Sequence, residues 1–292
     1  MPETHGELIK KLRRERGLTQ QQLAEGISTR TTLSSFENNK SRISADILFK
    51  YIEKMNISIQ EYLFYFNDST ATEKEIATQH FYNNVIKKRD SEIRKRILNY
   101  QNKYKNSKDF WFCCLAIELK LFLNNRHIEP VFDVKEDIKI LKEYLNKIQQ
   151  WGHFELSIFS NCLYIFSTEY IRGTYSTLLK KEKILSQIDT YENDLSIFLN
   201  NCIVLSFQRR EYKNIAFYCD QLYKISEKTP RKAFDRIMYN YYKELLKYCL
   251  GLHYDVTKYI NMFEDLGFTE HAENLRNFQH DLSFAKRKIL LY

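Results

Sequence analysis

Turn-forming residues are scarce in this sequence. Its 292 residues include only seven glycines and three prolines, against 20 phenylalanines and 21 tyrosines. A fold with many strands needs Gly, Pro, Asn and Asp at short intervals to reverse the chain. The scarcity therefore argues against a sheet protein, and we predict an all-α fold.

Long hydrophobic runs are also missing. No stretch approaches the roughly 18 consecutive apolar residues that a membrane span requires. The first residues, MPETHGELIKKLRRERG, lack the apolar core of a signal peptide. We therefore expect a cytoplasmic protein with no membrane partner.

The usual catalytic and metal-binding motifs are absent. The sequence has no G-x-x-x-x-G-K-[ST], no G-x-G-x-x-G and no G-x-S-x-G, and neither C-x-x-C nor H-E-x-x-H occurs. The cysteines all fall in apolar surroundings beyond residue 110: Cys113, Cys114, Cys162, Cys202, Cys219 and Cys249. We predict reduced core thiols, no metal site, no cofactor and no enzymatic activity.

Positive charge is in excess. The formal net charge is +8 at pH 7. An excess of this sign favours an anionic partner such as a nucleic acid, although it says nothing about fold.

The first 66 residues predict five short helices. Gly17 and Gly26 are placed to end the first two helices in a left-handed turn. Thr19 is placed to cap the second helix and Ser28 to cap the third. The fourth and fifth helices are expected over Ser44–Met55 and Ser58–Phe66.

Each of these helices has one apolar stripe, so they must cross around one small core. We expect the later helices to contribute to that core through Ile47, Leu48, Tyr51, Ile52, Leu63 and Phe64. A short turn between the second and third helices is typical of a helix-turn-helix. That arrangement leaves the outer face of the third helix free to enter a DNA major groove.

The segments GLTQQQLAEGIS, LSSFENNKSRIS and MNISIQEYLF resemble the XRE/Cro-type helix-turn-helix. More narrowly, they resemble the Rgg/GadR/MutR regulators of Gram-positive bacteria. The resemblance is specific for residues 4–66. It implies a λ-repressor-like DNA-binding domain followed by a long, all-helical repeat domain.

The third helix carries the candidate DNA contacts. Small hydroxyl side chains let a helix approach bases closely, Arg30 can donate two hydrogen bonds to guanine, and Lys40 and Arg42 follow where phosphates would run. The resemblance implies base-facing positions for Arg30, Thr31 and Ser35, and a phosphate clamp at Gln20. The predicted DNA-binding set is Gln20, Ser28, Thr29, Arg30, Thr31, Ser34, Ser35 and Lys40.

The resemblance also implies a structural ion pair and shows two departures. Arg13 and Glu37 would tie the first helix to the end of the third. Ser35 stands where many Rgg-like proteins have arginine, and Asn39 stands where they have glycine. Because Asn tolerates the left-handed conformation, we expect the turn at Asn39 to be preserved.

Three segments are predicted along the chain: a helix-turn-helix domain over residues 1–67, a polar linker over 68–75 and a repeat domain over 76–292. The last contains about eleven amphipathic helices, the first over residues 76–88 and another spanning 153–167. Asn161-Cys162 aligns with Asn201-Cys202, and Asn240 follows at nearly the same interval. A period of about 40 residues indicates one helix pair per repeat, as in a tetratricopeptide-like α-solenoid.

The repeated asparagines suggest a ladder that holds the backbone of an extended peptide, since an amide offers both a donor and an acceptor. The predicted peptide-binding set is Asn161, Tyr164, Asn201, Tyr239, Asn240 and Tyr242. The alternative is that these asparagines brace neighbouring helices.

The resemblance implies a regulator controlled by a short linear peptide pheromone. A homodimer on a palindromic operator of double-stranded DNA is expected, because one helix-turn-helix contacts only a few base pairs. Two other interpretations stay open: an Rgg-like regulator without a peptide ligand, and a helical-repeat scaffold whose DNA binding is secondary.

Overall fold

The structure is a computed structural model that describes residues 4–67, 70, 72–76, 89–127, 129–185 and 189–283. These residues form helices and connecting turns, and no strand occurs among them. The all-α prediction is therefore confirmed. The chain divides into two compact units, Met1–Lys88 and Arg89–Tyr292. The predicted limits of the linker stay a prediction, because several of its residues lie outside the described part.

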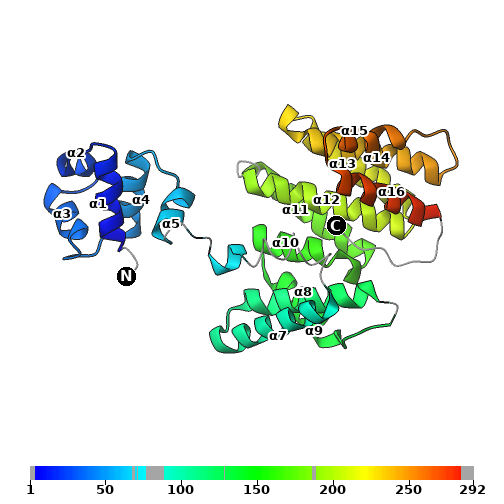
Figure 1. Ribbon diagram of the computed structural model, residues 1–292, viewed down its shortest axis with the longest axis horizontal. Helices are drawn as coiled ribbons and strands as arrows, with labels where there is room; N and C mark the ends of the chain where they lie inside the picture. Colours follow the sequence, from blue (N-terminus) through cyan, green and yellow to red (C-terminus); the bar gives the residue numbers. More distant parts are fainter. Residues whose placement is uncertain are drawn as a thin grey trace. The chain divides into compact units, whose positions relative to one another are not determined.

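Residues 5–66 of the N-terminal unit form five helices, as predicted (Figure 1). They are α1 (His5–Glu15), α2 (Gln20–Ala24), α3 (Arg30–Glu37), α4 (Ala45–Lys54) and α5 (Ile59–Phe66). Gly17 and Gly26 follow α1 and α2 with φ of 66° and 77°, a left-handed region that glycine enters without steric penalty. Asn39 adopts φ 58° after α3, so the turn is preserved there as expected.

Side-chain caps fix where these helices begin. Thr19 caps α2 and accepts a hydrogen bond from the backbone N–H of Gln22 at 3.1 Å. The cap of α3 is Thr29 rather than the predicted Ser28, because the Thr29 hydroxyl accepts from the N–H of Thr32 at 3.0 Å. Ser28 is instead engaged with the hydroxyl of Tyr51 on α4 at 2.5 Å.

The core of the N-terminal unit is correctly predicted for α1 to α4 but not for α5. Leu8, Ile9, Leu12, Leu23, Leu33, Tyr51 and Ile52 are all buried there. On α5 the predicted Leu63 and Phe64 are about half exposed, at 47% and 48%, and Tyr62 is buried instead. The ring of Phe66 stacks on His5 of α1 at 3.9 Å between centroids, so α5 turns Tyr62 and Phe66 toward α1 instead of Leu63 and Phe64.

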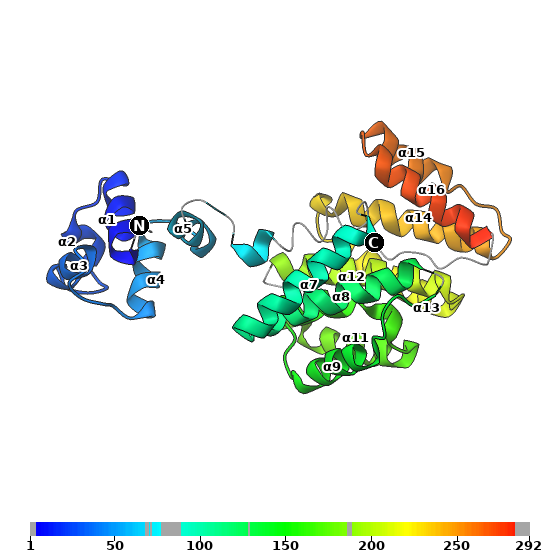
Figure 2. The same ribbon diagram turned by 60° about the horizontal axis from the view of Figure 1, so that its bottom comes forward.

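The C-terminal unit is a succession of helices with short connections. They are α7 (Asp90–Ser107), α8 (Phe110–Arg126), α9 (Lys135–Lys147), α10 (His153–Asn161), α11 (Thr168–Leu185), α12 (Asp189–Gln208), α13 (Tyr212–Ser226), α14 (Ala233–Cys249), α15 (Thr257–Asp265) and α16 (Thr269–Ser283). In both ribbon views α7 runs beside α8 and α15 beside α16 (Figures 1 and 2).

Two predicted helices differ from the structure or lie outside its described part. The helix expected over residues 153–167 ends at Asn161, and a 3₁₀ turn, η1 (Leu163–Ile165), follows it before α11. The helix expected over residues 76–88 lies almost wholly outside the described residues.

Hydrogen bonds between helices follow the predicted repeat period. The Asn161 amide donates to Glu118 Oε2 at 2.9 Å, which joins α10 to α8. The Asn201 amide donates to the carbonyl oxygen of Ser160 at 3.2 Å, which joins α12 to α10. Ser196 on α12 donates to the Asp235 carboxylate on α14. Partners about 40 residues apart therefore hold successive helix pairs together, as in a TPR-like α-solenoid.

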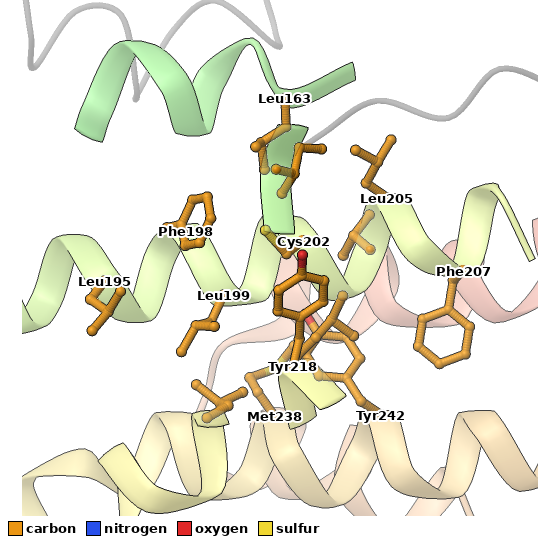
Figure 3. Close-up of a cluster of buried hydrophobic side chains, with 14 of the residues drawn as sticks. Leu163, Leu195, Phe198, Leu199, Cys202, Leu205, Phe207, Tyr218, Met238 and Tyr242 are labelled. Atoms are coloured by element: carbon orange, nitrogen blue, oxygen red, sulfur yellow. The ribbon is translucent and has the colours of Figure 1, made fainter. Parts of the chain in front are cut away.

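Helix α12 lies at the centre of this unit. It contacts α10, α13 and α14, and every residue from Asn201 to Phe207 is buried. Figure 3 shows its side chains between those of η1, α13 and α14, with the Tyr218 hydroxyl beside Cys202. Of the predicted core thiols, Cys114, Cys162, Cys202 and Cys219 are buried, whereas Cys113 and Cys249 are half-buried.

Candidate nucleic-acid interface and ligand pocket

Helix α3 separates an apolar inner face from a polar outer face. Leu33 and Phe36 are buried on the inner side, while Arg30 and Thr31 are exposed on the outer side in the first turn. Leucine and phenylalanine at this spacing anchor the helix against α1 and α2. The contacts with α1 and α2 therefore fix α3 in place and leave its outer face exposed.

The other predicted DNA contacts cluster around that face. Thr29, at the start of α3, is exposed, and Ser34 and Ser35 are partly exposed along the helix. Lys40 is exposed just after α3, where its backbone N–H donates to the Ser35 carbonyl oxygen at 2.8 Å. Ser28 is the member of the predicted set that faces the fold, through its bond to Tyr51.

A buried ion pair ties α1, α2 and α3 together. Arg13 donates two hydrogen bonds to the Glu37 carboxylate, from Nε at 2.6 Å and from Nη2 at 2.8 Å. The Gln20 amide, at the start of α2, donates to the same carboxylate at 2.8 Å. Burial opposes ionisation of Glu37, but these bonds hold the pKa of its carboxyl below the usual value. The expected Arg13–Glu37 bridge is confirmed.

The Gln20 contact orients the predicted phosphate clamp. One N–H of its amide is used by Glu37, and an amide nitrogen carries a second N–H that can donate to a phosphate oxygen. Gln20 thus lies at the start of α2, Arg30 at the start of α3, and Lys40 just after α3. This arrangement can contact both phosphates and base edges of a duplex.

Two of the predicted peptide contacts are not accessible as folded. Asn201 is 3% exposed and Tyr242 is 2% exposed, and Tyr242 packs among core side chains (Figure 3). The amides of Asn161 and Asn201 donate to the preceding helix pair, which corresponds to the alternative of inter-helix braces. An open ladder is therefore corrected at Asn201, whose amide is buried between helices, whereas a ligand contact at the partly exposed Asn161 stays a prediction.

The remaining four predicted peptide contacts, Asn161 among them, are partly exposed. Tyr164 lies in η1, and burial raises the pKa of its hydroxyl well above the usual value. The Tyr239 ring lies 5.0 Å from the Tyr223 ring between centroids. Asn240 on α14 is half-buried. Because Asn201 and Tyr242 are buried, the six predicted residues do not form a single exposed surface.

A pocket of about 380 Å³ lies elsewhere, between the end of α9 and α11. It is lined by Leu145, Asn146, Ile148, Gln149, Trp151, Tyr170, Gly173, Thr174, Thr177 and Leu178. Sequence reasoning missed it. The available signal was Gly173, one of only seven glycines, which stands inside a helix where no turn requires it.

Two absences are found among the described residues. No group of three or more His, Cys, Asp or Glu side chains there could hold a metal ion. No described helix is both long and apolar enough to cross a membrane.

Solved structures share this fold over nearly the whole chain. A protein from Listeria monocytogenes EGD-e assigned as a transcriptional regulator aligns with a TM-score of 0.78 at 21% identity, covering 96% of this chain and 99% of its own. The SHP pheromone receptor Rgg2 of Streptococcus dysgalactiae aligns with a TM-score of 0.71 at 18% identity, covering 95% and 99%. The PrgX/cCF10 complex aligns with a TM-score of 0.67 at 18% identity, covering 97% and 93%.

Family profiles match both units of the chain. A helix-turn-helix profile matches residues 9–62, which include the Arg13–Glu37 ion pair and the whole of α3. The profile of the C-terminal domain of the HTH-type transcriptional regulator Rgg matches residues 94–277, and so covers most of the helical repeats. With the helix-turn-helix segment and the repeat unit both matched, the chain belongs to the Rgg family of helix-turn-helix transcriptional regulators.

Proposed function

We propose that this regulator binds a palindromic operator as a homodimer and that a short linear peptide pheromone, bound by its repeat unit, controls that binding. The exposed outer face of α3 is the observation that supports DNA binding. Arg30 and Thr31 are exposed there, and Gln20 and Lys40 flank them. The peptide half is supported by the similarity of the fold to Rgg2 and PrgX, which are pheromone receptors or peptide complexes.

Each predicted DNA-binding residue is given a role from its chemistry and its place beside α3. Arg30 reads a guanine edge with two N–H donors, while Thr29, Thr31, Ser34 and Ser35 allow close approach. Gln20 and Lys40 hold the phosphate backbone and set the register of α3. Ser28 acts indirectly, by holding the start of α3 to Tyr51.

A homodimer is expected because one helix-turn-helix covers only a short stretch of DNA. A single helix-turn-helix contacts only a few base pairs, whereas two related by a two-fold axis read half-sites about one helical turn apart, roughly 34 Å. Two copies thus give the affinity and the palindromic preference that one lacks.

The test is selection of duplexes from a random DNA library by the full-length protein. We expect enrichment of a two-fold symmetric sequence, and a complex of two chains per duplex in light scattering. Synthetic peptides encoded by short reading frames beside the gene are then titrated into the complex, and operator affinity is measured by fluorescence anisotropy.

Each outcome separates the interpretations. A peptide that changes operator affinity at least tenfold supports the proposal. Operator binding that no peptide alters favours a regulator without a peptide ligand. The absence of any enriched duplex favours a scaffold role instead.

A further inference from the structure

The pocket between α9 and α11 has an apolar base and a polar rim. Leu145 and Leu178 are buried at 2% and 5% exposure, and the half-buried Trp151 and Tyr170 rings also line the space. Asn146 and Thr177 are exposed at its edge. A cavity built in this way suits a ligand with an apolar end and a polar backbone.

The rings that line the pocket are held in place by hydrogen bonds. The Trp151 indole N–H donates to the Leu145 carbonyl oxygen at 3.2 Å. The Tyr170 hydroxyl donates to Asn146 Oδ1 at 2.7 Å and is also bonded by the Thr174 hydroxyl. The shape of the pocket is therefore set before a ligand arrives.

Two side chains at the rim of the pocket have hydrogen-bonding groups that can serve a ligand. Asn146 uses its carbonyl oxygen for Tyr170, so its amide nitrogen still carries two N–H donors that can reach a peptide carbonyl. The Thr177 hydroxyl donates to the Gly173 carbonyl oxygen at 3.1 Å, which leaves its oxygen able to accept from a peptide N–H. Donor and acceptor together match one peptide group.

Gly173 keeps the pocket open. It lies within α11, where glycine is less favourable than alanine for helix formation. A Cβ placed on it would meet no atom within 4 Å, and its φ is not in the left-handed range, so neither crowding nor backbone conformation requires glycine. Because glycine has no side chain, Gly173 leaves space at the wall of the cavity.

From these observations we infer that the pocket beside Gly173 is a subsite for one large apolar side chain of a linear peptide, with Asn146 and Thr177 bonding the adjacent peptide group. The inference rests on the proposed peptide control and assigns it a place outside the asparagine ladder. The volume accommodates an indole or a branched aliphatic group.

The experiment uses full-length protein labelled with ¹⁵N at its two tryptophans, Trp111 and Trp151. N-acetyl-tryptophanamide and N-acetyl-leucinamide are the probes, and N-acetyl-lysinamide is the polar control. We expect the Trp151 indole signal to shift with a dissociation constant of about 0.1–10 mM for the apolar probes. The Trp111 signal stays unchanged, and the Trp151→Phe variant assigns the two signals.

Two substitutions at Gly173 separate an effect on ligand binding from an effect on folding stability. Gly173→Leu fills the cavity and is expected to weaken binding at least tenfold. Gly173→Ala is expected to weaken it about threefold while raising the thermal midpoint by roughly 1–4 °C, because alanine favours the helix. Ser176→Leu, on the exposed surface of α11 and outside the lining, is the matched control and retains binding.

An unmoved Trp151 signal, or equal shifts in Gly173→Leu and the unsubstituted protein, overturns the inference. The proposed function is tested separately through operator affinity. A pheromone that alters operator affinity equally in Gly173→Leu and in the unsubstituted protein keeps the proposed function and removes this pocket from it.

Discussion

Charged side chains of the N-terminal unit divide into those that are exposed to solvent and those that hold the fold. Arg30 and Lys40 are exposed beside α3, whereas Arg13 and Glu37 are buried in a bidentate pair. Both groups are charged, so composition does not separate them. Burial and bonding do, because a buried charge needs a partner and an exposed one does not.

Replacing Arg30 by alanine is expected to relax specificity at one base pair of the operator. Loss of a bidentate base contact costs about 1–3 kcal/mol at that position. Binding to a panel of single-base operator variants, measured by anisotropy at fixed salt, checks this. Lys40→Ala is the control and is expected to weaken all sequences alike. If Arg30→Ala also weakened all duplexes equally, Arg30 would be a phosphate contact.

Glu118 is expected to make the stability of the repeat unit pH-dependent. Burial raises the pKa of Glu118 to about 8, against an ordinary value of 4.5, and the bond from Asn161 offsets this only in part. Between those values the folded carboxyl keeps its proton while the unfolded one loses it. Stability therefore falls as pH rises from about 5 to 8, by at most about 1.4 kcal/mol per pH unit from this group.

The check is urea unfolding of the full chain at several pH values, with Glu118→Gln alongside. The glutamine keeps an oxygen that can accept from Asn161 but does not titrate. We expect the variant to show a shallower fall in stability with pH. Equal slopes for the two proteins would mean that Glu118 is ionised in the folded state.

At the scale of elements, the repeat is held by bonds between helices one pair apart. The α12 amide of Asn201 reaches the α10 backbone, and the α10 amide of Asn161 reaches α8. The same spacing in sequence could equally have served a ligand on an exposed face. The decisive fact is that α12 is central and covered on several sides, so its asparagine turns to a neighbour.

Asn201→Ala is therefore expected to lower the free energy of unfolding by about 1–3 kcal/mol, since a buried inter-helix bond is lost. Asn200→Ala is the matched control: its amide donates within its own helix, to the Ser196 carbonyl oxygen at 2.9 Å. A smaller loss is expected there. Denaturant unfolding checks both variants. If Asn201→Ala left stability unchanged but weakened peptide affinity, the asparagines would bind the peptide as first predicted.

Over the whole molecule, the cysteines fall into a buried group and a half-buried group. Cys114, Cys162, Cys202 and Cys219 are buried, and burial raises the pKa of each thiol, to about 12 for Cys219. Neutral buried thiols react slowly because the thiolate is the nucleophile.

We expect a thiol reagent to label at most Cys113 and Cys249 in the native chain and all six cysteines after unfolding. Mass spectrometry of digested, labelled protein identifies the sites. Fast native labelling of the four buried thiols would show that the repeat unit opens readily in solution.

The sequence alone determined the fold class and the positions of the helices in the helix-turn-helix. Scarce glycine and proline, single apolar stripes and cap residues act locally, so the five N-terminal helices and the left-handed turns at Gly17, Gly26 and Asn39 were predictable. The 40-residue period likewise predicted helix pairs, because each repeat must bury the same face.

Only the tertiary structure decided which side chains of a helix stay exposed. It turned Leu63 and Phe64 outward on α5, placed Asn201 in the core and gave the cap of α3 to Thr29. It also formed the pocket beside Gly173 from residues of α9, the following loop and α11. Periodicity gives the spacing of residues on a helix, but how many neighbours cover that helix depends on packing between segments distant in sequence.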